Sequence, residues 1–157
     1  MKKETENQVP LTRILAIDLG TNAGWCYTDE IGTDSGFWMA KTYAPWAKCF
    51  LEVLEKYNPE IIVCSQTNSF GHMNATKKMY MYYGIVCLLC ERKELPVVEF
   101  NDSSARKSLF GYGKGKKEYF HKLFDEKFPK WADFTGDQKD AIVLALGWKK
   151  INSPSVG

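Results

Sequence analysis

A short apolar run that ends in an acid is the feature that most constrains the fold of this chain. Residues 13–18 read Arg-Ile-Leu-Ala-Ile-Asp and are followed by Leu-Gly-Thr. This pattern is typical of a buried strand that meets a turn. An acid that closes a buried strand loses hydration unless another group compensates, and open α/β sheets bind ligands at strand ends of this kind. Asp18 is therefore the first candidate for a functional residue.

The remaining apolar patterns predict an α/β fold, with a mixed five-stranded sheet and helices on both of its faces. Besides the run at 13–18, strands are expected near residues 25–27, 37–40, 60–66 and 95–100, the first two of these as a hairpin. Helices are expected near residues 46–57, 73–92, 103–110, 119–128 and 137–148. A single domain should span residues 12–150, with flexible tails at 1–11 and 151–157.

Several protein classes are excluded by the sequence. No apolar run approaches the roughly 20 residues of a membrane-spanning helix, so we expect no membrane association. Residues 1–10 lack the apolar segment of a secretory signal, and the five cysteines are an odd number. We therefore expect a reducing, cytoplasmic setting. Cys87 and Cys90 form a C-x-x-C motif inside an apolar run, which we interpret as buried structural thiols rather than half of a zinc site.

Two further acids point to metal chemistry. Asp137 and Asp140 are three residues apart, which places both carboxylates on one face in the first turn of the last helix. Acids in a first turn also favour the helix macrodipole without any further function. If this helix packs beside the first strand, however, three carboxylates converge, and Mg²⁺ or Mn²⁺ would relieve their repulsion.

A basic segment suggests a phosphate-containing partner. Residues 103–130 hold eight basic and three acidic side chains, although the whole chain carries a net charge of only +2. The Gly-Lys-Gly-Lys-Lys run at 113–117 lets backbone amides and lysines approach a phosphate, whereas a solvated helix face explains the later lysines. The stretch 67–74 holds amides and Phe70, which suit either DNA contacts with base stacking or a loop anchored in the core.

Four motifs in order resemble the RuvC-type Holliday junction resolvases, especially their small phage-encoded branch. The resemblance covers residues 14–148. It comprises the opening Ile-Leu-Ala-Ile-Asp-Leu-Gly, the strand Pro-Glu-Ile-Ile-Val-Cys-Ser-Gln at 59–66, the block from Leu95 through Gly113 to Lys117, and the closing Asp-Gln-Lys-Asp-Ala at 137–141.

This resemblance implies a ribonuclease-H-like fold and a Mg²⁺-dependent endonuclease, with Mn²⁺ as a substitute, that resolves four-way and other branched DNA junctions by paired symmetric nicks in recombination and repair. It implies metal binding by Asp18, Asp137 and Asp140, and contact of Arg106 and Lys117 with the scissile phosphate. It also implies a homodimer formed through the helix at 74–91. DNA contacts would come from Asn68, Phe70, Lys77, Lys78, Lys107, Lys114, Lys116 and Lys117.

One departure from the family pattern concerns the metal site. The family has a metal-binding Glu at the end of its second core strand, where this chain has Ser65 followed by Gln66. Three interpretations stay open: another acid such as Glu99 or Asp102 compensates, the oxygens of Ser65 or Gln66 hold metal more weakly, or the chain binds junctions and cuts them poorly.

One family of ATPases and one other family of nucleases share part of this sequence pattern. The Asp-Leu-Gly-Thr start also resembles the first phosphate loop of the actin and Hsp70 ATPases, but 157 residues cannot supply the two domains that those proteins need. A YqgF-like nuclease of the same superfamily that acts on RNA remains an alternative, as does a junction-binding protein without cleavage.

Overall fold

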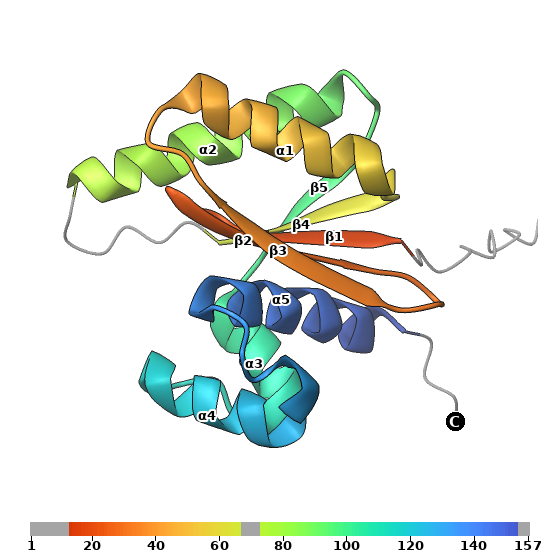
Figure 1. Ribbon diagram of the computed structural model, residues 1–157, viewed down its shortest axis with the longest axis vertical. Helices are drawn as coiled ribbons and strands as arrows, with labels where there is room; N and C mark the ends of the chain where they lie inside the picture. Colours follow the sequence, from red (N-terminus) through yellow and green to blue (C-terminus); the bar gives the residue numbers. More distant parts are fainter. Residues whose placement is uncertain (1–12, 67–72, 154–157) are drawn as a thin grey trace, which may run out of the picture.

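The computed structural model describes residues 13–66 and 73–153 (Figure 1). Its centre is a five-stranded sheet in the order β3-β2-β1-β4-β5. The strands are β1 (Ile14–Asp18), β2 (Asn22–Thr28), β3 (Thr33–Met39), β4 (Ile61–Ser65) and β5 (Val97–Phe100). β1 to β3 are antiparallel neighbours, while β1, β4 and β5 run parallel. The predicted mixed sheet is therefore confirmed.

Two helices cover one face of the sheet, α1 (Tyr43–Tyr57) and α2 (Met73–Glu91), seen above it in Figure 1. Leu15 and Ile17 of β1 point into this layer, where they join a core rich in aromatic rings. At its centre the fully buried Trp46 stacks on Tyr82, with ring centroids 4.7 Å apart, and Trp38 meets it edge to face. We call this layer the aromatic face.

The opposite face is covered by α5 (Gly136–Asn152), with α3 (Asp102–Phe110) and α4 (Lys117–Lys127) packed outside it (Figure 1). Ile14 and Ala16 of β1 point into this layer, together with Val63 of β4. The helices thus lie on both faces of the sheet, as predicted. We call this layer the α5 face.

The elements differ from the predicted ones mainly at their ends. α5 continues to Asn152 and so includes the first two residues of the predicted C-terminal tail, whereas the predicted tail at 1–11 lies outside the described residues. A 3-10 helix at Pro129–Trp131 had no periodic signal. The five cysteines are free thiols, with Cys90 buried and Cys87 half-buried. No helix in the described part of the chain is long and apolar enough to cross a membrane.

Candidate active site

Asp18 lies on the α5 face because of the pleat of β1. Side chains alternate along a strand, so Asp18 points to the same side as Ile14 and Ala16. Directly after it, the Leu19 N–H donates a hydrogen bond to the Ser65 hydroxyl, 3.0 Å away at the end of β4. This bond joins the carboxyl ends of two neighbouring parallel strands, which fixes the position from which the Asp18 carboxylate projects.

The turn after Asp18 is also held from the aromatic face. Trp46 Nε1 donates to the Gly20 carbonyl at 2.8 Å, and the Thr21 and Tyr82 hydroxyls are 3.1 Å apart. Buried polar groups need hydrogen-bond partners, so hydrogen bonding as well as apolar packing fixes the positions of the Trp46 and Tyr82 rings. The packing of α1 and α2 therefore positions a residue on the opposite face of the sheet.

The first turn of α5 is brought against the sheet beside Asp18. Thr135 and Gln138 form a reciprocal capping box, which starts the helix just before Asp137. Gly24 is the register partner of Asp18, and a β-carbon built there would lie 2.0 Å from the Asp137 carbonyl oxygen. The absent side chain of Gly24 thus allows the close approach that the convergence of the three acids requires.

Asp18 is a deeply placed carboxylate with little compensation. It keeps some accessible surface, yet within the described residues it has no hydrogen bond and no ion pair. Burial, followed by the charges of Asp140 and Asp102, raises the pKa of Asp18 well above its usual value. Without a metal ion, the fold therefore disfavours the charged form of Asp18. A bound cation would favour that charged form.

Asp140 is the carboxylate with cationic partners. Its Oδ2 is 2.7 Å from Lys117 Nζ, and its Oδ1 is 2.9 Å from His121 Nε2. Burial alone would raise the pKa of Asp140, but the hydrogen bond from His121 and the charge and hydrogen bond of Lys117 lower it. Asp137 has no such partner among the described residues, and burial raises its pKa against the opposing charge of Lys117. Lys117 thus lies among the acids.

A fourth acid, Asp102, enters the same region from the first turn of α3. Asp102 and Asp140 line one small pocket together with Arg106 and Val143. Burial and then the charge of Asp140 raise the pKa of Asp102, against the charges of Arg106 and Lys117. The Arg106 guanidinium also lies over the Phe120 ring, 4.8 Å from its centroid. The structure therefore brings Arg106 to the predicted acids.

The position of the family Glu is occupied by neutral groups that already have partners. Ser65 is almost fully buried, and its hydroxyl accepts the bond from Leu19. The Gln66 side-chain oxygen accepts a hydrogen bond of 2.9 Å from the Asn101 amide. Glu99 lies on the other side of β5, where its charge acts on Cys64 and Tyr83 of the aromatic face. Of the two acids expected to compensate, Asp102 is at the site and Glu99 is not.

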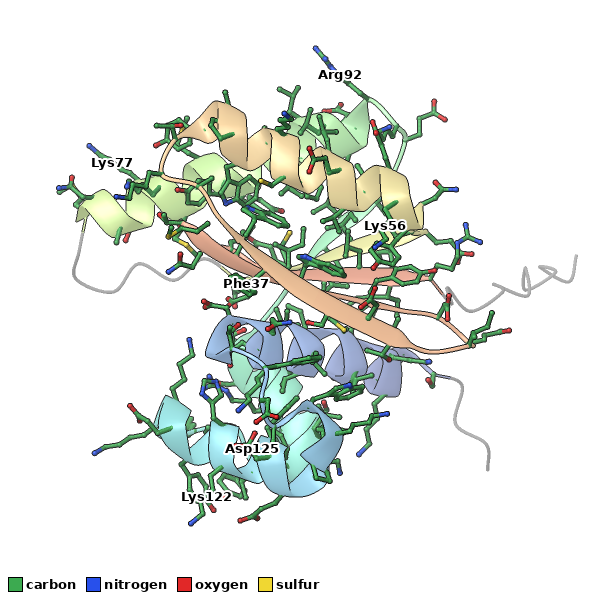
Figure 2. The ribbon with its side chains drawn as sticks, viewed as in Figure 1. Phe37, Lys56, Lys77, Arg92, Lys122 and Asp125 are labelled. Atoms are coloured by element: carbon green, nitrogen blue, oxygen red, sulfur yellow. The ribbon has the colours of Figure 1, made fainter. Side chains whose placement is uncertain are left out.

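Most of the predicted DNA-contact lysines are exposed. Lys77 and Lys78 lie on α2, where Lys77 points away from the sheet (Figure 2), and Lys107, Lys114 and Lys116 lie on or near α3 and α4. Asn68 and Phe70 lie outside the described residues. Gly111 ends α3 with a φ of 87°, and a β-carbon on Gly113 would lie 2.0 Å from the Ser103 carbonyl oxygen. The local backbone geometry thus explains why glycine is needed at these two positions, so a bound phosphate is not required to explain them.

The donor chemistry fits a hard divalent cation. Carboxylate oxygens are the ligands that Mg²⁺ and Mn²⁺ prefer, and Asp18 offers its oxygens without a competing hydrogen bond in the described structure. Among residues 13–66 and 73–153, no three acidic, His or Cys side chains are already gathered into a closed cluster. The Lys117 ammonium supplies positive charge beside Asp140.

Two contributors to this region had no place in the sequence analysis. His121 lies one turn after Lys117 on α4, so the i,i+4 spacing of two basic side chains was the available signal. Gly24 could be recognised only through its distance from Asp137, because a glycine in a strand indicates a close backbone approach but not its partner.

Fold and site together define an α/β protein of the ribonuclease-H-like class, with acids at the ends of β1 and at the starts of α3 and α5. No protein-family profile matches the chain. The RuvC crossover junction endodeoxyribonuclease of Rhizobium rhizogenes is 28% identical over 148 residues, which cover 85% of this chain and 86% of that protein.

Two solved structures share the fold. Thermus thermophilus RuvC in complex with a Holliday junction substrate has a TM-score of 0.71 at 17% identity and covers 89% of this chain and 96% of that one. The yeast mitochondrial Holliday junction resolvase Ydc2 has a TM-score of 0.65 at 17% identity and covers 92% of this chain and 80% of that one. The chain is similar in sequence to the RuvC crossover junction endodeoxyribonucleases and shares the fold of the solved RuvC structure, which confirms the ribonuclease-H-like fold that the resemblance implies.

Proposed function

We propose that this protein is a metal-dependent endonuclease that cuts four-way and other branched DNA junctions. The observation that carries the proposal is that Asp137 and Asp140 of α5 lie close enough to Asp18 for their charges to act on it, within a chain similar to RuvC. Mg²⁺, or Mn²⁺ in its place, would activate the attacking water and stabilise the leaving oxygen of a phosphodiester. Asp18, Asp137 and Asp140 would hold it.

The basic side chains around the acids have separate tasks. Lys117 pairs with Asp140 and keeps that carboxylate ionised, and it remains half-exposed, so its ammonium can also contact a phosphate oxygen. Arg106 lies in the pocket beside Asp102 and would stabilise negative charge on the scissile phosphate. His121 holds the other oxygen of Asp140 and orients it as a positioning residue.

DNA would approach through the phosphate backbone. The exposed lysines Lys107, Lys114 and Lys116 extend the positive charge beyond the acids, and their contacts with phosphates make binding weaken steeply as salt rises. Lys77, labelled in Figure 2, and the neighbouring Lys78 would add charge on α2. Asn68 and Phe70 would contribute polar contacts and base stacking.

A homodimer would form through α2. One stripe of this helix exposes large apolar side chains at Tyr80 and Leu88, with exposed fractions of 52% and 56%, and Met81 beside them is 49% exposed. Gly84 lies between Tyr80 and Leu88 at helical spacing, and its open side has no atom within 4 Å of a built β-carbon. Such an unpaired stripe around a glycine suits close packing against the same helix of a second copy.

A dimer explains paired cutting, because two sites related by a two-fold axis meet opposing strands of a junction symmetrically. The same proposal places the protein in the cytoplasm, with a bacteriophage in its bacterial host as the setting. Gly84→Leu tests the interface: it should convert the dimer to a monomer in sedimentation, since the larger side chain blocks close helix contact. An unchanged dimer would place the interface elsewhere.

The activity is tested by incubating the full chain with a synthetic four-way junction and with linear duplex, in EDTA, Mg²⁺ and Mn²⁺. Symmetric nicks in the junction, dependent on metal, are expected. Equal cutting of structured RNA would favour a YqgF-like nuclease instead. Junction-selective binding in EDTA with no nicks in either metal would identify a binding protein and contradict the proposed enzyme.

A further inference from the structure

We propose that Asp102 is the fourth carboxylate of the metal site and takes the place of the Glu that RuvC-type resolvases have at the end of β4. This inference rests on the proposed function and deepens it. Ser65 and Gln66 do not supply a negative charge at the end of β4. In this proposal the charge comes instead from Asp102, the first residue of α3.

The topology brings Asp102 to the same edge of the sheet as the residue that it replaces. β4 and β5 are parallel neighbours, and Ser65 is the register partner of Phe100. Asp102 follows Phe100 by two residues, so it leaves the carboxyl end of the strand adjacent to β4. Parallel strands present their carboxyl ends at one edge, where ligand sites of open α/β sheets are found.

A direct contact joins the two positions. The Asn101 amide donates to the Gln66 side-chain oxygen at 2.9 Å, and the Gln66 N–H donates to the Phe100 carbonyl at 3.1 Å. The segment after β4 is therefore tied to the residue that immediately precedes Asp102. Gln66 at the family position therefore contacts the residue that precedes Asp102, although the two are far apart in sequence.

Asp102 also faces the other acids. It lines one pocket with Asp140, and its charge acts on Asp18, as the charges of Asp140 and Asp137 do. Asp18 itself lies deep in the protein with no hydrogen bond and no ion pair among the described residues. A bound cation would stabilise the anionic form of an unpartnered carboxylate in this position, and Asp102 is placed to share that cation.

Helix capping does not explain Asp102. The cap of α3 is Asn101, whose side-chain oxygen accepts hydrogen bonds from the Ser103 and Ser104 N–H groups. Asp102 therefore takes no part in the cap. In the described structure its carboxylate also has no hydrogen bond and no ion pair.

The test compares Asp102→Asn with the wild-type chain and with Glu99→Gln, a matched acid-to-amide change on β5 at the opposite face. Binding of Mn²⁺ without DNA is measured from the electron paramagnetic resonance signal of the free ion. Asp102→Asn should weaken Mn²⁺ binding at least about tenfold. Glu99→Gln should leave it unchanged. Equal Mn²⁺ affinity of Asp102→Asn and wild type would overturn the inference.

Thermal unfolding in EDTA separates a metal ligand from a helix-stabilising acid. Removing one of several repelling carboxylates should raise the melting temperature of Asp102→Asn in EDTA and reduce the further rise on adding Mg²⁺. A lower melting temperature in EDTA, with an unchanged response to Mg²⁺, would show a purely structural role and overturn the inference.

A second variant tests the exchange of positions. Adding Ser65→Glu to Asp102→Asn returns a carboxylate to the end of β4 and should restore Mn²⁺ affinity, whereas a folded double variant that stays weak would contradict the exchange. The proposed function fails separately: a wild-type chain that neither binds Mn²⁺ nor nicks junctions contradicts it. If the wild-type chain nicks junctions and Asp102→Asn cuts and binds Mn²⁺ equally well, only the assignment of Asp102 is contradicted.

Discussion

The aromatic face and the α5 face are built on the same five strands, yet they differ in how their polar groups are satisfied. On the aromatic face, Trp46 is fully buried and its indole N–H has a carbonyl partner at Gly20. On the α5 face, Asp18 lies deep with no such partner in the described structure, and Asp102 is disfavoured as an anion. On the aromatic face the buried Trp38 indole N–H also has no partner among the described residues, but that group is neutral, whereas the α5 face holds charges that repel each other.

This difference separates stability from function. Burial of large aromatic rings contributes favourably to folding, whereas buried carboxylates of like charge oppose it. The two faces are nevertheless connected, because Trp46 and Tyr82 reach through the layer to the turn that follows Asp18. The aromatic face thus supplies the rigid support against which the repelling acids of the α5 face are held.

The largest expected effect is on the aromatic face. Trp46→Ala removes the ring that packs on Trp38, Phe50 and Tyr82, and should lower the free energy of unfolding by about 3–5 kcal/mol. Denaturant titration measures this loss. A decrease below about 1 kcal/mol would show that the aromatic face does not carry the stability assigned to it.

The second effect concerns the contact between α5 and the sheet. Gly24→Ala places a methyl group against the Asp137 backbone and should destabilise the fold by about 1–3 kcal/mol, while cutting falls because the acids separate. Gly32→Ala in the same hairpin is the control, since no atom lies within 4 Å of its built β-carbon. Equal stability of the two variants would show that the close approach at Gly24 is unimportant.

A smaller effect is expected from the cation on the α5 face. Lys117→Ala should reduce both junction cutting and junction binding, with cutting slowed about 10- to 100-fold. The loss of Lys117 also raises the pKa of Asp140, so the acid limb of the pH–rate profile should move to higher pH. Lys122→Ala, on the outer side of α4 (Figure 2), is the control. If Lys117→Ala cuts at the same rate as Lys122→Ala, Lys117 has no role in the active site.

The sequence was sufficient for the sheet, for the positions of Asp18, Asp137 and Asp140 and for Lys117, because apolar periodicity and motif spacing are local properties. It left the compensation for Ser65 open, since the choice between Glu99 and Asp102 depends on which side of β5 the Glu99 side chain takes and on where α3 begins. Val98 and Phe100 pack on the α5 face, which directs Glu99 to the aromatic face. His121 became visible only when α4 was placed beside Asp140.

We propose that the repelling carboxylates of the α5 face serve metal-dependent cutting, and Asp18→Asn is the first variant with which to test this. Because the pKa of Asp18 is raised in the fold, its contribution to stability is present at low pH and lost as pH rises. In EDTA at about pH 7.5 the variant should therefore melt at a higher temperature than the wild type, with the difference shrinking toward about pH 4.

The same variant is then given the four-way junction with Mg²⁺. Binding should persist while cutting falls at least about a thousandfold, which corresponds to about 4 kcal/mol in the barrier. We therefore expect Asp18→Asn to be more stable than the wild type, to bind the junction and no longer to cut it. A variant that melts at a lower temperature, or that still cuts at the wild-type rate, would contradict this proposal.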